Sequence, residues 1–155
     1  MAVIYVVRHA KAGSRDRWDG EDELRPLSKN GHRQSDALVE PLAAGGASEL
    51  LSSPYVRCMQ TLEPLAERLG VKVVADERLA EGAAFEPALD LVHSAESGAV
   101  LCSHGDLIPD LIGALHRRGA HITTAADWRK ASVWVLDRRH GKVETMAVWP
   151  PPDAV

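Results

Sequence analysis

Two histidines and two arginines stand where apolar segments of the chain end. Arg8 and His9 directly follow a β-branched run near the N-terminus, Arg57 follows a second short apolar segment, and His104 follows a later one. The carboxyl ends of parallel strands share one edge of a sheet, where helix N-termini favour anions. Arginine also grips phosphate-type oxygens bidentately. The pattern predicts an anion site; a metal site would need a third ligand, and none with suitable spacing accompanies His9 and His104.

The segments that must position these residues alternate between strand and helix patterns, which is typical of an α/β fold. Strands are predicted at 3–7, 49–52, 71–74, 99–102, 132–137 and 143–148. Helices are predicted at 29–44 after an N-cap at Ser28, at 54–69 after an N-cap at Ser53, at 86–94 and at 106–117. We expect a mostly parallel central sheet. The short spacer at 138–142 predicts a hairpin, so at least one edge strand is expected to run antiparallel.

Composition limits the class of protein. The 155 residues, 45% hydrophobic and 26% charged, fit one domain, expected over 1–149 with a flexible C-terminal tail at 150–155. A net charge of -4 argues against a nucleic-acid partner. No segment approaches the ~20 apolar residues of a membrane span, so we expect no membrane association and a cytoplasmic location. Cys58 and Cys102 lie in apolar segments without metal or redox spacing, which favours buried reduced thiols but leaves a disulfide open.

Four sequence blocks resemble one family. VRHAK at 7–11 is similar to the Arg-His-Gly signature of the histidine phosphatase (phosphoglycerate-mutase-like) superfamily, and its Ala-Lys form resembles the small SixA-type phosphohistidine phosphatases. RPLS at 25–28 followed by Gly31, SSPYVR at 52–57 followed by Gln60 and Thr61, and LCSHG at 101–105 match further blocks in the family's order. The resemblance spans roughly residues 3–115. It departs at Ala10, where glycine is commonest and a small residue suffices.

This resemblance implies a fold and a chemistry. The fold would be the phosphoglycerate-mutase-like three-layer sandwich, with the central sheet between helices. His9 would be the nucleophile that becomes transiently phosphorylated, while Arg8, Arg57 and His104 would hold the phosphate. Glu81 lies where family members carry the carboxylic acid that protonates the leaving oxygen, and the alternative is a loop glutamate in solvent. No metal or other cofactor is expected, because guanidinium groups would neutralise the phosphate charge.

Further residues are candidates for binding the substrate. Three of them follow His9 in the sequence: Lys11, Ser14 and Arg15. The other two are Arg25, which begins the block at 25–28, and Gly105, which follows His104.

The expected function is a metal-independent phosphatase whose partner is a phosphorylated substrate. The chain has no long insertion to cover the site, which favours a phosphohistidine protein or a small phosphomonoester. A nucleotide (poly)phosphate is the other substrate class, since the segment after His9 looks like that of histidine-phosphatase domains fused to Nudix hydrolases. A phosphomutase and a non-catalytic phosphate-binding module are the remaining alternatives.

Overall fold

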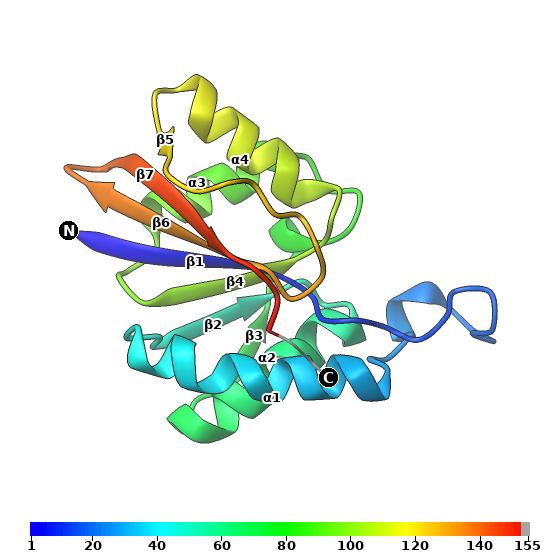
Figure 1. Cartoon of the computed structure of the whole chain (residues 1–155). Helices are drawn as coiled ribbons and strands as arrows, with labels where there is room; N and C mark the ends of the chain where they lie inside the picture. The colour runs from blue at the N-terminus through cyan, green and yellow to red at the C-terminus, as the bar shows by residue number, and fades with distance from the viewer. Residues whose placement is uncertain (153–155) are drawn as a thin grey trace.

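The computed structural model describes residues 1–152, so the last three residues of the expected tail at 150–155 lie outside the described part. Within it, the strands form one seven-stranded sheet in the order β3-β2-β4-β1-β6-β7-β5 (Figure 1). The strands are β1 (Ala2–Arg8), β2 (Glu49–Ser52), β3 (Val73–Ala75), β4 (Ala99–Ser103), β5 (His121–Ile122), β6 (Val133–Arg139) and β7 (Lys142–Trp149). The α-helices are α1 (Lys29–Ala44), α2 (Val56–Leu69), α3 (Phe85–Ser94) and α4 (Leu107–Arg117), and short 3-10 helices occur at η1 (Asp22–Leu24) and η2 (Glu77–Leu79).

The sheet is mostly parallel, as predicted. β1 pairs in parallel with β4, and β2 pairs in parallel with both β4 and β3. The predicted hairpin is β6–β7, and β6 also runs antiparallel to β1. This antiparallel strand lies inside the sheet rather than at its edge, which corrects the prediction. The reason is that β7 and the two-residue β5 add to its outer side.

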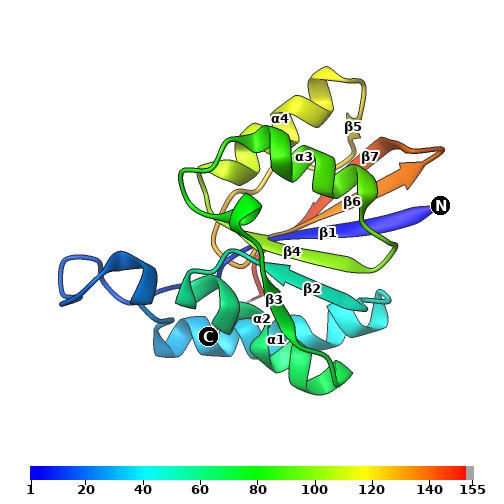
Figure 2. The same ribbon diagram turned by 180° about the vertical axis from the view of Figure 1, so that it is seen from behind.

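Side chains that alternate along the strands build a separate core on each face of the sheet. Ile4 and Val6 of β1 pack into the cluster that includes α3 and α4, whereas Tyr5 and Val7 pack into the cluster that includes α1 and α2. Strand residues point alternately to opposite faces, so a strand buried on both faces must be apolar throughout. The β-branched run of β1 meets that requirement, and the result is the predicted three-layer sandwich (Figures 1 and 2).

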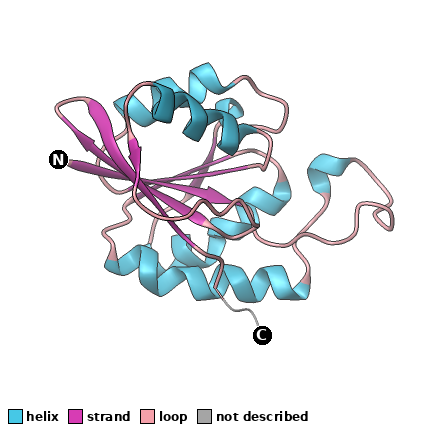
Figure 3. Cartoon of the chain, turned by 45° about the horizontal axis from the view of Figure 1, so that its top comes forward, coloured by secondary structure: helices cyan, strands magenta, loops and turns pink. Residues whose placement is uncertain are grey.

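Two long connections leave these layers. The segment 12–27, which contains η1, projects from the sheet beyond the carboxyl end of β1 (Figures 1 and 3). The segment 123–132 leads from β5 to β6. Among residues 1–152, no helix is long and apolar enough to cross a membrane.

Candidate active site

The carboxyl ends of β1 and β4 bring the two histidines together. Arg8 is paired with Ser103 across these strands, and the backbone N–H of His9 donates to the Ser103 carbonyl at 3.0 Å. His9 and His104 therefore leave the same edge of the sheet, and their ring centroids lie 5.4 Å apart. Two groups this close can contact one phosphate, which is the convergence expected from the sequence.

His9 is held as a neutral imidazole with one nitrogen free. Its side chain is buried, and Nδ1 lies 2.8 Å from the Ala10 carbonyl oxygen. A carbonyl only accepts, so Nδ1 carries the proton and Nε2 keeps its lone pair. Burial is the main cause that lowers the pKa of His9 to about 3, with the charges of His104, Arg57 and Arg8 acting in the same direction. The ring is thus ready to act as a nucleophile at neutral pH.

One threonine ties the His9 segment to α2. Thr61 accepts a hydrogen bond from the Ala10 N–H at 2.9 Å and donates to the Arg57 carbonyl at 2.7 Å. The neighbouring Gln60 accepts from the backbone N–H of Leu27 at 2.8 Å. The block at residues 52–61 therefore positions both the His9 segment and the loop 12–27.

His104 is oriented by the segment that precedes α2. Its Nε2 lies 2.8 Å from the Ser53 hydroxyl and 3.5 Å from Cys58 Sγ, and Tyr55 packs edge-on against its ring at 4.7 Å. The predicted helix cap at Ser53 is wrong: α2 begins at Val56 after an N-cap at Tyr55. The Ser53 hydroxyl bonds the histidine instead, and it also accepts a hydrogen bond from the Tyr55 N–H at 3.3 Å, ahead of the helix. The predicted buried free thiols of Cys58 and Cys102 are confirmed.

Arg57 lies at the centre of the site and is almost fully buried. It donates from Nη1 to the Asp22 carbonyl at 2.8 Å and from Nη2 to Asp22 Oδ2 at 2.9 Å. Glu81 Oε1 lies 3.5 Å from the same Nη2 and 4.0 Å from His104 Nδ1. The structure therefore places Glu81 at the site, beside both residues expected to hold phosphate.

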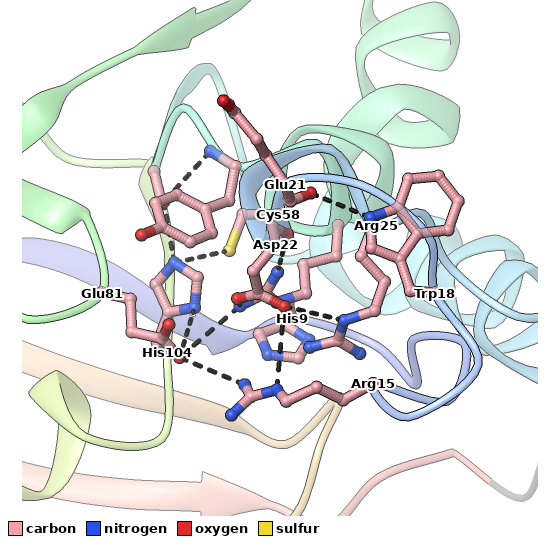
Figure 4. Close-up of polar contacts among 12 residues, drawn as sticks. His9, Arg15, Trp18, Glu21, Asp22, Arg25, Cys58, Glu81 and His104 are labelled. Atoms are coloured by element: carbon pink, nitrogen blue, oxygen red, sulfur yellow. Dashed lines mark hydrogen bonds and ion pairs between the residues drawn. The ribbon is translucent and has the colours of Figure 1, made fainter.

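Asp22 is the site residue that sequence analysis missed. Its Oδ1 accepts from Arg25 Nε at 2.9 Å and lies 3.7 Å from Arg15 Nε, so one carboxylate serves three arginines (Figure 4). Burial alone would raise the pKa of Asp22, but hydrogen bonds from Arg25 and Arg57 outweigh it and hold the pKa below its usual value. Nothing in the local sequence distinguishes Asp22 from the other acids of its loop.

Arg8 is fixed by backbone groups. Its Nη1 donates to the Trp128 carbonyl at 2.6 Å. A Cβ on Gly105 would stand 2.6 Å from the Arg8 guanidinium carbon, so glycine leaves room for this side chain in its present position. Gly105 thus shapes the site through Arg8.

Three buried nitrogen atoms at this site have no hydrogen-bond partner. They are Arg8 Nε, Arg57 Nε and His104 Nδ1. Buried polar atoms are nearly always paired, so unpartnered ones call for an explanation. Two guanidiniums and an imidazole around a neutral His9 are the groups that would surround a phosphoryl oxyanion.

The predicted substrate-binding residues do not all reach the site. Arg25 is buried against Asp22, and the exposed Arg15 reaches Asp22 and Glu81 at 3.7 and 3.8 Å. Lys11 is exposed two residues after His9, whereas the Ser14 side chain makes no hydrogen bond with the described residues. No group of three or more His, Cys, Asp or Glu within 1–152 could hold a metal ion.

The sequence of this chain also matches the model of a known protein family. The model of the histidine phosphatase superfamily (branch 1) matches residues 4–86, more than half of the chain. The chain belongs to the histidine phosphatase superfamily. The matched range holds Arg8, His9, Arg57 and Glu81, while His104 and the segment that fixes Arg8 lie beyond it.

Relatives in sequence match over different lengths. The 8-oxo-(d)GTP phosphatase of Mycolicibacterium smegmatis (strain ATCC 700084 / mc(2)155) is 36% identical over 156 residues, which cover 97% of this chain and 48% of that protein. A probable phosphoglycerate mutase GpmB of Klebsiella pneumoniae is 31% identical over 86 residues, which cover 52% of this chain and 38% of that protein. The chain therefore spans about half the length, or less, of these curated relatives.

Solved structures share the fold. A SixA protein from Nakamurella multipartitia superposes with a TM-score of 0.74 at 24% identity, covering 97% of this chain and 96% of that one. The protein histidine phosphatase SixA complexed with tungstate gives a TM-score of 0.73 at 19% identity, covering 90% and 91%. The predicted phosphoglycerate-mutase-like, SixA-like α/β architecture is confirmed.

Proposed function

We propose that this chain is a metal-independent phosphatase that acts through a phosphohistidine on His9. The observation that carries the proposal is a set of buried nitrogens of Arg8, Arg57 and His104 that make no hydrogen bond with the described residues and surround a neutral His9. Donors fixed before the reaction stabilise charge as it develops on a transferring phosphoryl group.

The reaction has two steps. His9 Nε2 forms a bond to phosphorus as the bond to the leaving oxygen breaks, and Glu81 gives its proton to that oxygen. A water then attacks the phosphohistidine, the Glu81 carboxylate takes up the water's proton, and inorganic phosphate leaves a neutral His9. Arg8, Arg57 and His104 bind the phosphoryl oxygens in both steps.

A small phosphorylated molecule is the substrate class we favour over a phosphohistidine protein. The loop 12–27 folds over Arg57, which is only 1% exposed, so the phosphate site lies below the protein surface. A nucleotide is the specific candidate, because the relative that matches 97% of this chain is named an 8-oxo-(d)GTP phosphatase.

Trapping the intermediate tests the proposal. Rapid mixing with radiolabelled p-nitrophenyl phosphate and quenching in alkali should leave label on the protein that is stable in base and lost in acid, as a phosphoramidate requires. His9→Ala should abolish both label and turnover, while His32→Ala on the exposed face of α1 should retain both.

The alternatives give different results. A phosphate-binding module would bind vanadate but form no labelled protein, and a phosphomutase would pass its label to an acceptor substrate rather than to water. Turnover by a folded His9→Ala protein would exclude His9 as the nucleophile.

A further inference from the structure

The turn before β6 places a lysine next to the residues that end β1. The backbone N–H of Ala131, which has a φ of 66°, lies 3.0 Å from the Arg8 carbonyl oxygen and 3.2 Å from that of His9. Arg8 in turn donates to the Trp128 carbonyl. The turn is therefore wrapped around the residues that end β1, and Lys130 lies within it. Neither the four sequence blocks nor the matched range 4–86 includes this lysine.

Lys130 is half-buried among groups of its own charge. Burial lowers its pKa from the usual value, and Arg8, Arg25, Lys11 and Arg15 act on it in the same direction. The hydrogen bonds from the Ala131 N–H to the Arg8 and His9 carbonyls place Lys130 beside the end of β1, at the same edge of the sheet as these basic residues.

Among the described residues, no carboxylate of the site forms an ion pair with Lys130. Asp22 pairs with the three arginines already described, Glu81 lies within ion-pair distance of Arg57 and Arg15, and Asp106 acts on Arg8. Within residues 1–152, the ammonium groups of Lys130 and Lys11 have no hydrogen-bond acceptor. A half-buried charge that has no ion-pair partner and lies among like charges destabilises the protein unless an anion binds there.

We infer that Lys130, with Lys11, binds a second anionic group of the substrate, beside the phosphoryl group that His9 receives. This inference rests on the proposed function and narrows its substrate class. The substrate would carry a second phosphate or a carboxylate close to the transferred phosphate, as in a nucleoside diphosphate or a phosphorylated hydroxy acid. Lys130 would be a specificity residue, because it contacts a group that does not react.

A charge-neutral variant tests the inference. In Lys130→Met, kcat/KM for a nucleoside diphosphate should fall about 10-fold more than kcat/KM for p-nitrophenyl phosphate, since one charge-assisted contact is lost. The loss should appear mainly in KM, because the second anion is bound equally in the ground state and the transition state. Lys130→Arg should retain most of the wild-type kcat/KM for the nucleoside diphosphate. Phosphoglycolate, measured in parallel, separates a carboxylate from a second phosphate.

Controls separate the possible failures. Lys72→Met, on the exposed surface, should leave the ratio between the substrates as in the wild type. The Tm of Lys130→Met should not fall, because the substitution removes a repelled charge. The inference would be overturned if Lys130→Met lowered kcat/KM by the same factor for all three substrates, or left kcat/KM unchanged for all of them. Absence of a phosphoenzyme from p-nitrophenyl phosphate in the wild type would instead overturn the proposed function.

Discussion

Neutralising Asp22 should strengthen the binding of an oxyanion. The Asp22 carboxylate occupies Arg57 Nη2 and Arg25 Nε, both at 2.9 Å. A phosphate that reaches Arg57 must compete with this carboxylate for the same guanidinium. In Asp22→Asn the side chain keeps nearly the same shape but loses its charge, so the competition weakens.

The size of the effect follows from these two contacts. Hydrogen bonds to charged groups each stabilise by about 1.5–3 kcal/mol. The Asp22 side chain is 32% exposed, so solvent screening reduces the combined competition to about 1–2 kcal/mol. Since 1.4 kcal/mol is a factor of ten, the Kd for vanadate should decrease about 5- to 30-fold.

Isothermal titration with vanadate measures this change. Asp19→Asn is the matched control, because Asp19 lies on the same loop, carries the same charge and makes no hydrogen bond or ion pair with the described residues. Vanadate binding to Asp22→Asn that is unchanged or weaker, in a protein with the wild-type Tm, would refute the competition. It would show that Asp22 helps Arg57 to bind the oxyanion.

Four further predictions follow from the site. Because the pKa of His9 is about 3 in the folded protein and about 6.5 when unfolded, the unfolded chain binds the extra proton between these values. The free energy of unfolding should therefore fall as pH drops from 6.5 towards 4, and it should fall less steeply in His9→Gln. The pH profile of kcat/KM should show no ionisation of His9 near pH 6.5. Glu81→Gln should lower kcat about 100-fold or more for alkyl phosphates but far less for p-nitrophenyl phosphate, whose leaving group needs no proton; equal losses would argue against proton donation. Gly105→Ala should displace the Arg8 guanidinium and reduce kcat/KM about 100-fold while circular dichroism stays unchanged. Activity should survive EDTA, and its loss with recovery on adding a divalent ion would point to metal catalysis.

The sheet was largely readable from the sequence. β1 and β4 are continuous apolar runs, and the structure buries Val6 and Leu101 almost completely because both faces of these strands are covered. The hairpin β6–β7 followed from its short spacer. The position of β6 inside the sheet could not be read, because strand order depends on long-range pairing that no local pattern encodes.

The site was readable only where side-chain type carries the chemistry. His9, Arg57 and His104 stand at strand ends and have the residue types that an anion requires. The Arg8 partner, by contrast, is the backbone carbonyl of Trp128, which any residue could supply. The Ser53 error has a related cause: its hydroxyl bonds His104, 51 positions away, and the Tyr55 N–H ahead of the helix, but no N–H of α2 itself. Tertiary contacts determine the partners of both Arg8 and Ser53, and the local sequence does not encode these contacts.

The central place of β1 has a consequence for how the protein is made. This strand leaves the ribosome before the others, yet its neighbours are β4, where Val6 is paired with Leu101, and β6, where Val6 is paired with Trp134. Its hydrogen bonds must wait for most of the chain, and such non-local pairing slows folding and leaves an apolar strand open to aggregation. During synthesis, His9 and Arg8 therefore remain without their site until the turn before β6 has emerged.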